Sequence, residues 1–192
     1  MQPWQPNPQF PIQLPIAADA RIVPLEYTND QVWELCLGGG DPPALSLQTT
    51  YGLRARQMRL LYQFAIERRV VSDLVDYAAP PTLDRIYPNY LRLTARPAEN
   101  LRVQMEFWCP SSTLLCGRLK FTNTGEQTVT TGFRAAAQLT PMEEGEKMAN
   151  RQAGINQVLA GRTGNLNPLF FITGGPEPSS GAVPGLGLEM QL

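Results

Sequence analysis

The chain has 192 residues, of which 43% are hydrophobic and 17% are charged, and its formal net charge is −1. This is enough apolar material for one domain with a sizeable core, and too much for a disordered tail. The near-zero net charge argues against nucleic acid or an anionic membrane as a partner, because both need a basic surface. The sequence has no histidine, so it lacks the usual general base near neutral pH and the commonest metal ligand. We therefore expect neither a metal nor a cofactor.

The cysteines are an odd and sparse set: Cys36, Cys109 and Cys116. Without a CxxC pair or a histidine, they cannot complete a four-ligand zinc site. Cys109 and Cys116 face each other in a predicted hairpin, so one disulfide between them is an open alternative to buried thiols. Reduced thiols suit the cytoplasm, and no stretch approaches the ~18–20 apolar residues that span a membrane. The sequence therefore predicts a cytoplasmic protein.

Residues 1–20 are rich in proline, which stands at positions 3, 6, 8, 11 and 15. This spacing predicts an extended arm with few ladder hydrogen bonds. Trp4 and Phe10 would anchor the arm to the domain or to a partner. Residues 21–192 are predicted to form the domain itself.

The first half of this domain has mainly a period of two. Residues 32–37 and 45–53 are predicted strands, separated by the break at Gly38–Gly40 and the prolines that follow. Residues 57–71 fit either a strand, a turn and a second strand, or a helix; we favour the strands. Residues 78–88 contain three prolines and are predicted to be a loop.

The second half continues the alternation. A short strand is expected at 90–94, and residues 101–107 and 115–121 are predicted to pair as a hairpin. Further strands are expected at 131–139, 155–159, 169–173 and 186–192, with one helical turn opening the segment 143–160 and a loop over 174–185. Many short strands without a long helix predict a mainly β protein, an antiparallel β-sandwich.

Catalytic chemistry has weak support in the residues. Ser111 and Ser112 have no activating base nearby in sequence, and an unactivated hydroxyl is a weak nucleophile. The carboxylates cluster at Glu143, Glu144 and Glu146, and at Asp73 and Asp76. Both clusters lie in polar, turn-like contexts without an apolar pocket to raise a pKa, so we expect solvated acidic loops. The glycine runs lack phosphate-loop spacing and are predicted to be turns.

Aromatic side chains offer another chemistry, because a flat ring complements the C–H face of a sugar. The candidates are Trp4, Trp33, Trp108, Tyr51, Tyr87 and Tyr90. Trp33 and Trp108 flank strand residues, which favours the core for both. The densest basic patch, Arg54, Arg56 and Arg59, could meet an acidic ligand or make an interdomain ion pair; a solvated strand face is the simpler interpretation.

Four segments carry a resemblance to a known family: DPPALSLQTTYGLRARQMR, PNYLRL, VQMEFWCPSSTLLCGRLKFTNTGEQ and LNPLFFITGGPEPSSGAVPGLGLEMQL. They resemble the N-terminal β-domain of large bacterial glycoside hydrolases of the glycogen-debranching, amylo-α-1,6-glucosidase-like and glycoside-phosphorylase-like kind. The resemblance covers about residues 30–192 and implies a galactose-mutarotase-like supersandwich that precedes an (α/α)6 catalytic barrel. No position matches the catalytic motif of the family, so no catalytic residue is carried over.

The resemblance implies a non-catalytic accessory domain that packs on and supports a downstream catalytic domain of the same protein. Because the chain ends in an alternating strand, we expect it to be the first part of a longer protein. The candidate contacts to a carbohydrate or to the next domain are Tyr51, Arg54 and Trp108, and a homo-oligomer is a further candidate assembly. Two alternatives stay open: a stand-alone carbohydrate-binding or protein-interaction module, and a small hydrolase that uses Glu143 or Glu144 as its acid.

Overall fold

The computed structural model describes residues 11–20, 24, 26, 28, 32–67, 69–142, 144–153, 156–174, 179–183 and 187–191, and the statements below refer to these residues. Within them, no helix has the length and apolar character needed to cross a membrane. The predicted anchors of the arm, Trp4 and Phe10, lie outside the described residues.

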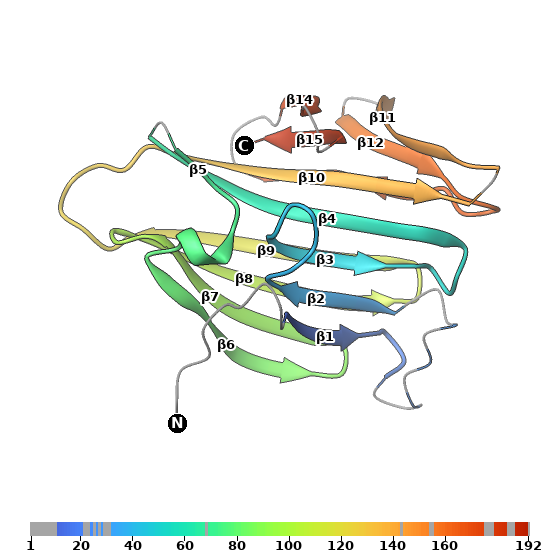
Figure 1. The fold of residues 1–192 in the computed structure, drawn as a ribbon, viewed down its shortest axis with the longest axis horizontal. Helices are drawn as coiled ribbons and strands as arrows, with labels where there is room; N and C mark the ends of the chain where they lie inside the picture. The colour runs from blue at the N-terminus through green and yellow to red at the C-terminus, as the bar shows by residue number, and fades with distance from the viewer. Residues whose placement is uncertain are drawn as a thin grey trace.

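The first sheet, sheet A, opens with four antiparallel strands in chain order (Figure 1). They are β1 (Ile12–Ile16), β2 (Trp33–Leu37), β3 (Leu45–Thr49) and β4 (Ala55–Ile66). The arm predicted for residues 1–20 thus contributes β1, whose Pro15 is tolerated because β1 is an edge strand. The chain then turns at Glu67 (φ 55°), and β5 (Arg69–Val71) pairs with the end of β4. This confirms two strands, and not a helix, over residues 57–71.

The second sheet, sheet B, is another antiparallel meander that lies behind sheet A in Figure 1. After the 3-10 turn η1 (Leu74–Asp76), it contains β6 (Ala79–Tyr87), β7 (Tyr90–Ala98), β8 (Leu101–Ser111) and β9 (Leu114–Asn123). The predicted hairpin of residues 101–107 and 115–121 is confirmed by the pairing of β8 with β9.

The chain then returns to sheet A. Strand β10 (Thr131–Pro141) pairs with β4, and beyond it lie β15 (Gly187–Gln191) and β14 (Ser179–Val183). A small sheet C follows β10 in the chain and contains β11 (Glu146–Ala153), β12 (Asn156–Arg162) and β13 (Leu169–Phe170).

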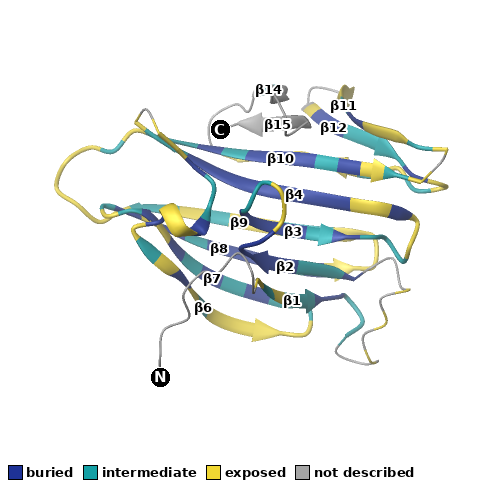
Figure 2. Cartoon of the chain, in the orientation of Figure 1, coloured by how far each residue is buried: buried dark blue, intermediate teal, exposed yellow. Residues whose placement is uncertain are grey.

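The core lies between sheets A and B. Along β4, the inward side chains Met58, Leu60, Tyr62 and Phe64 are all buried, as the period of a strand requires. The ring of Tyr62 stacks on that of Phe107 from β8, with 5.6 Å between centroids. Figure 2 shows the buried stretches of β3, β4 and β10. The predicted antiparallel β-sandwich is therefore confirmed.

Proline-rich segments were the first source of wrong predictions. Residues 78–88 are not a loop but contain β6. Strand β6 is the edge of sheet B, and its two prolines fall where the pairing register shifts between Ala79 and Thr82. The strand predicted at 90–94 likewise extends to Ala98, with Pro97 at a second register shift. Edges and bulges are the places where a strand tolerates a missing N–H group.

The other wrong predictions concern segments rich in glutamate or glycine. The helical turn predicted at the start of 143–160 is wrong, because Glu146–Ala153 form β11. The loop predicted over 174–185 is wrong in part, because Ser179–Val183 form β14.

Strand β3 ends at Thr49, four residues before the predicted end at residue 53. Three consecutive residues of positive φ follow it, Tyr51 (50°), Gly52 (63°) and Leu53 (68°), and a strand cannot continue through that conformation.

The loop between β2 and β3, residues 38–44, folds over the outer face of sheet A (Figure 1). The side chain of Arg59, 3% exposed, lies beneath it. Its guanidinium donates hydrogen bonds to the carbonyl oxygens of Gly39 (3.1 Å), Asp41 (3.3 Å) and Pro42 (3.1 Å) and to the hydroxyl of Ser46 (3.2 Å). The solvated face expected for Arg54, Arg56 and Arg59 is therefore wrong for Arg59.

The backbone conformation of this loop explains the glycine run. Gly38, Gly39 and Gly40 have φ angles of 77°, 77° and 80°, which only glycine adopts at low cost. A Cβ atom on Gly40 would also collide with the guanidinium of Arg59. Ala44, at the end of the loop, forms a second small apolar cluster with Leu61 and Ala136.

All three cysteines are free thiols. Cys109 points into the core and is 2% exposed, whereas Cys116 is opposite Trp108 on the other face of sheet B. The two side chains therefore leave the sheet on opposite sides, and the disulfide alternative is not realised.

Thiol titration of the native protein at mildly alkaline pH is expected to show one fast-reacting cysteine, Cys116. Burial raises the pKa of Cys36 and of Cys109 to about 12, so both stay protonated, and the thiol form is a poor nucleophile. In guanidinium chloride all three should react. The change Cys116→Ser should remove the fast phase; loss of that phase in Cys36→Ser instead would contradict the assignment.

Candidate functional site

The outer face of sheet B, turned away from sheet A, carries polar and aromatic side chains on neighbouring strands. Along β8, Leu101, Val103, Met105 and Phe107 are buried in the core. The alternate residues of β8 therefore point outward. They are Arg102, Gln104, Glu106 and Trp108.

An aromatic row crosses this face at one end of the sheet. Tyr87 of β6 is opposite Tyr90 of β7, and Tyr90 is opposite Trp108 of β8. The centroids of the two tyrosine rings are 6.0 Å apart. Tyr87 is 54% exposed, and Tyr90 and Trp108 are half-buried. Directly opposite residues share one face of a sheet, so the three rings form one surface, called the aromatic row below.

A charged network adjoins the aromatic row. Glu106 lies two residues from Trp108 on the same face and accepts a hydrogen bond from the hydroxyl of Tyr90 (2.6 Å). Its other oxygen accepts one from Nε of Arg118 (2.6 Å). The hydrogen bond from Tyr90, opposed by burial of the carboxylate and assisted by Arg118, lowers the pKa of Glu106. Glu106 is thus an ionised acceptor at neutral pH, held in place by two donors.

A polar hollow of about 390 Å³ occupies the other end of this face. Its lining residues are Thr82, Asp84, Thr94, Arg102, Gln104, Lys120 and Thr122. Asp84 accepts a hydrogen bond from the Thr94 hydroxyl (2.8 Å) and lies 3.6 Å from Nε of Arg92. The hollow thus combines hydroxyl and amide groups with two cationic side chains.

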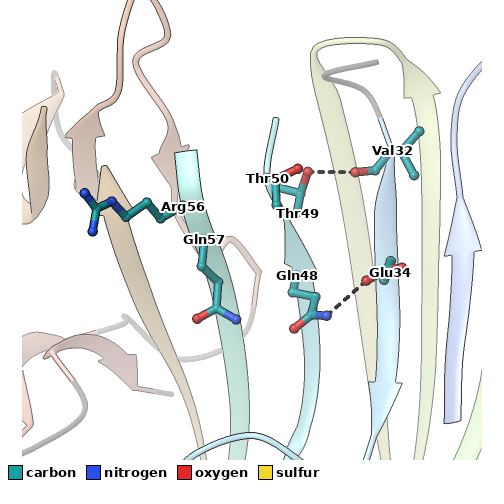
Figure 3. Close-up of a pocket in the computed structure, with 7 residues that line it drawn as sticks. All are labelled: Val32, Glu34, Gln48, Thr49, Thr50, Arg56 and Gln57. Atoms are coloured by element: carbon teal, nitrogen blue, oxygen red, sulfur yellow. Dashed lines mark hydrogen bonds between the residues drawn. The ribbon is translucent and has the colours of Figure 1, made fainter. Parts of the chain in front are cut away.

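A smaller hollow of about 100 Å³ lies on sheet A and is drawn in Figure 3. Two of its groups are paired internally: Gln48 donates to Glu34 (3.0 Å), and Thr49 donates to the carbonyl oxygen of Val32 (2.7 Å). Arg56 extends away from Glu34. The internal pairing and the small volume make this the weaker of the two candidate sites.

The three predicted contact residues do not form one site. Trp108 lies on the outer face of sheet B and not in the core, where its strand position had suggested. Tyr51 lies in the β3–β4 loop and packs edge-on against Trp33 (5.7 Å between centroids), where burial raises the pKa of its hydroxyl. Arg54 is exposed, and its carbonyl oxygen accepts a hydrogen bond from Thr163. Tyr51 and Trp33 thus close one end of the core, and Trp108 is the contact candidate that faces outward.

The acidic clusters are structural where they are described. Asp73 caps η1 by accepting a hydrogen bond from the backbone N–H of Val75 (3.1 Å). Glu146 pairs with Arg162 (3.4 Å) and Arg151 (3.8 Å), Glu144 is exposed and Glu143 lies outside the described residues. The residues that the structure describes contain no group of three or more His, Cys, Asp or Glu side chains placed to hold a metal ion.

Comparison with known proteins gives no relative: no family model, no curated protein and no solved structure matches this chain.

Sequence reasoning missed the Glu106 network and the polar hollow. The alternation of apolar and polar residues along β8 indicated that residues 102, 104 and 106 face outward. What joins Glu106 to Tyr90 and Arg118 is the register of β7, β8 and β9, which no single segment reveals. The hollow also needs β6, which was predicted as a loop.

Proposed function

We propose that this chain is a non-catalytic accessory β-sandwich of a carbohydrate-active enzyme. It would support a downstream (α/α)6 catalytic domain and present the outer face of sheet B to a saccharide. The observation that carries this proposal is the aromatic row with the Glu106 network beside it. The resemblance of the sequence to glycoside hydrolase N-terminal domains agrees with it.

The chemistry of the row suits a sugar. Exposed aromatic rings offer flat apolar surface to the C–H face of a pyranose, and polar tips such as the tyrosine hydroxyl stay available for hydrogen bonds. The exposed guanidinium of Arg118 donates hydrogen bonds of the kind that sugar hydroxyl groups accept, and the buried Glu106 holds Arg118 and Tyr90 in place. A few fixed polar groups beside aromatic surface are typical of small-molecule sites.

Support of a neighbouring domain has a separate candidate surface around the β3–β4 loop. Thr163 bonds the carbonyl oxygen of Arg54 and accepts a hydrogen bond from the N–H of Met142 (3.2 Å). On the two loops joined in this way, Leu53 is 65% exposed and Met142 is 44% exposed. Covering these apolar side chains would favour contact with another domain.

The proposed location is the cytoplasm. Three free cysteines, two of them buried, are typical of a reducing compartment.

The change Trp108→Ala is expected to weaken saccharide binding by the isolated chain about tenfold or more, a loss of about 1.4 kcal/mol. Truncation removes the indole ring, the largest stacking surface of the aromatic row, and because Trp108 is half-buried on an outer face, the fold should persist. A glycan array identifies a ligand, and isothermal titration calorimetry then measures its affinity for both chains.

The matched control is Phe171→Ala, which removes an aromatic side chain that is 51% exposed elsewhere and should leave the affinity unchanged. Equal affinity of Trp108→Ala and the unchanged chain would count against the proposal, as would a panel of α-glucans and other oligosaccharides that gives no binding at all. A reading frame that continues into a helical catalytic domain favours the accessory role, and its absence favours a stand-alone binding module.

A further inference from the structure

The outer face of sheet B has an excess of positive charge, although the whole chain has a formal net charge of −1. Strand register and side-chain contacts place six cationic and two anionic side chains there. They are Arg85, Arg92, Arg96, Arg102, Arg118 and Lys120 against Asp84 and Glu106. Because Arg96 pairs with Glu99 of the adjoining turn, the excess is three positive charges. Such a local field attracts an anionic ligand even where the net charge of the protein does not.

The two carboxylates of this face already have partners. Asp84 is bonded by Thr94 and faces Arg92, and Glu106 is bonded by Tyr90 and Arg118. Arg102 and Lys120 differ, because no carboxylate among the described residues lies within ion-pair distance of either. Their positive charge is therefore available to a ligand.

Arg102 and Lys120 both line the polar hollow. In the β8–β9 register, Arg102 is opposite Thr122, and Lys120 is opposite Gln104, so the two cations are diagonal neighbours on one face. An arginine fork and a lysine ammonium together suit a carboxylate or a sulfate ester. The surrounding threonine hydroxyls and the Gln104 amide suit the hydroxyl groups of a sugar.

The polar hollow and the aromatic row are joined by β8. Trp108 and Arg102 are six residues apart on the same face of this strand, which is about 20 Å at the rise of a β-strand. Glu106 and Gln104 lie between them, also facing outward. This distance suits an oligosaccharide and exceeds a single sugar.

We infer that the outer face of sheet B binds an acidic oligosaccharide, with a neutral sugar against the aromatic row and the anionic group of an acidic sugar between Arg102 and Lys120. This inference rests on the proposed function and adds the class of ligand to it. The shared chemistry is one anionic group on an otherwise hydroxyl-rich chain, supplied by a uronic acid or by a sulfated sugar.

A single-stranded nucleic acid fits the same face less well. Stacking on the aromatic row and attraction to arginines are available to it. However, Glu106 lies beside the row and Asp84 lines the hollow, and these carboxylates would repel a chain that carries a phosphate on every residue. An oligosaccharide with a single anionic group can place that group between Arg102 and Lys120 and leave the carboxylates beside uncharged sugar residues.

The test uses the complete chain and pairs of probes that differ in one group. Uronate-containing oligosaccharides are compared with the same compounds after carboxyl reduction, and sulfated oligosaccharides with their desulfated forms; a thymidine oligonucleotide is the third arm. We expect at least tenfold tighter binding of one acidic form than of its neutral counterpart, and this difference should shrink as salt is added.

The double variant R102Q/K120Q should lose this preference and keep the affinity for the neutral form. Arg69→Gln, an exposed arginine on β5, is the matched control and should keep the preference.

Each outcome decides between the two proposals. Equal binding of acidic and neutral forms, or a preference that survives in R102Q/K120Q, overturns the inference and leaves the proposed function standing. Tighter binding of the oligonucleotide than of any glycan also overturns it. Failure of every glycan to bind overturns both. Circular dichroism of each variant checks that the sandwich is folded.

Discussion

Replacing Arg59 with Met is expected to lower the free energy of unfolding by about 3 kcal/mol, because it removes the donors that satisfy buried acceptors. The guanidinium bonds three carbonyl oxygens of the β2–β3 loop, at Gly39, Asp41 and Pro42. Burial lowers the pKa of Arg59, against the field of Asp41, which raises it. Methionine keeps most of the side-chain volume but donates nothing, so the loop would lose its attachment to sheet A.

The matched control is Arg56→Met, three residues earlier on the same strand. Arg56 is exposed, and an exposed substitution usually changes stability by about 0.5 kcal/mol or less. Urea denaturation gives both values, and thermal unfolding should show a fall of about 6–12 °C for Arg59→Met in a domain of this size. Similar stabilities for the two variants would show that the loop does not depend on Arg59.

The substitution Phe64→Ala should cost about 4 kcal/mol, within the range for a large aromatic side chain removed from a core. Phe64 is fully buried, and its ring meets three others: Tyr77 (6.1 Å between centroids), Phe121 (6.2 Å) and Phe133 (5.9 Å). Phe121 belongs to sheet B, and Phe64 and Phe133 to sheet A. Truncation therefore leaves a cavity where the two sheets meet.

Two further variants make this result specific. Phe64→Leu retains part of the volume and should cost clearly less than Phe64→Ala. Phe171→Ala removes an exposed ring and should leave the free energy of unfolding nearly unchanged. If urea denaturation gave the same small loss for all three, Phe64 would not be a central contact of the core.

The sequence predicted the sandwich well wherever alternation was clean. In β4 the inward residues Met58, Leu60, Tyr62 and Phe64 recur at every second position, and the left-handed turn at Glu67 falls where the strand was expected to reverse. In β8 and β9 the same period predicted a hairpin that the structure confirms. A two-residue period of this kind has few explanations other than a half-buried strand.

The failures have a common cause in long-range pairing. The prolines of residues 78–88 suggested a loop because a central strand cannot hold them, but β6 is an edge strand. Local sequence does not state which strand will be at an edge. Similarly, the glutamates before Lys147 suggested a helix start, and pairing of β11 with β12 overrides that local preference.

The candidate site was predicted only in part. Tyr87, Tyr90 and Trp108 were all recognised as rings that could stack on a sugar, but Trp108 was expected in the core. Their alignment follows from the register of β6, β7 and β8, which no single segment reveals. Arg102 and Lys120 were not selected, because an exposed cation carries no distinctive local signal until its neighbours are known.

The return of β10 to sheet A has a consequence for how the chain reaches its native state. Sheet B joins neighbours in sequence and can form as one local unit. Strand β4, by contrast, pairs with β10, which is made much later. The paired residues are 65 positions apart at one end (Ile66 with Thr131) and 86 positions apart at the other (Ala55 with Pro141). Closing so long a loop is entropically costly and slow, so during synthesis the newly made β4 keeps an open hydrogen-bonding edge until residues 131–141 have left the ribosome.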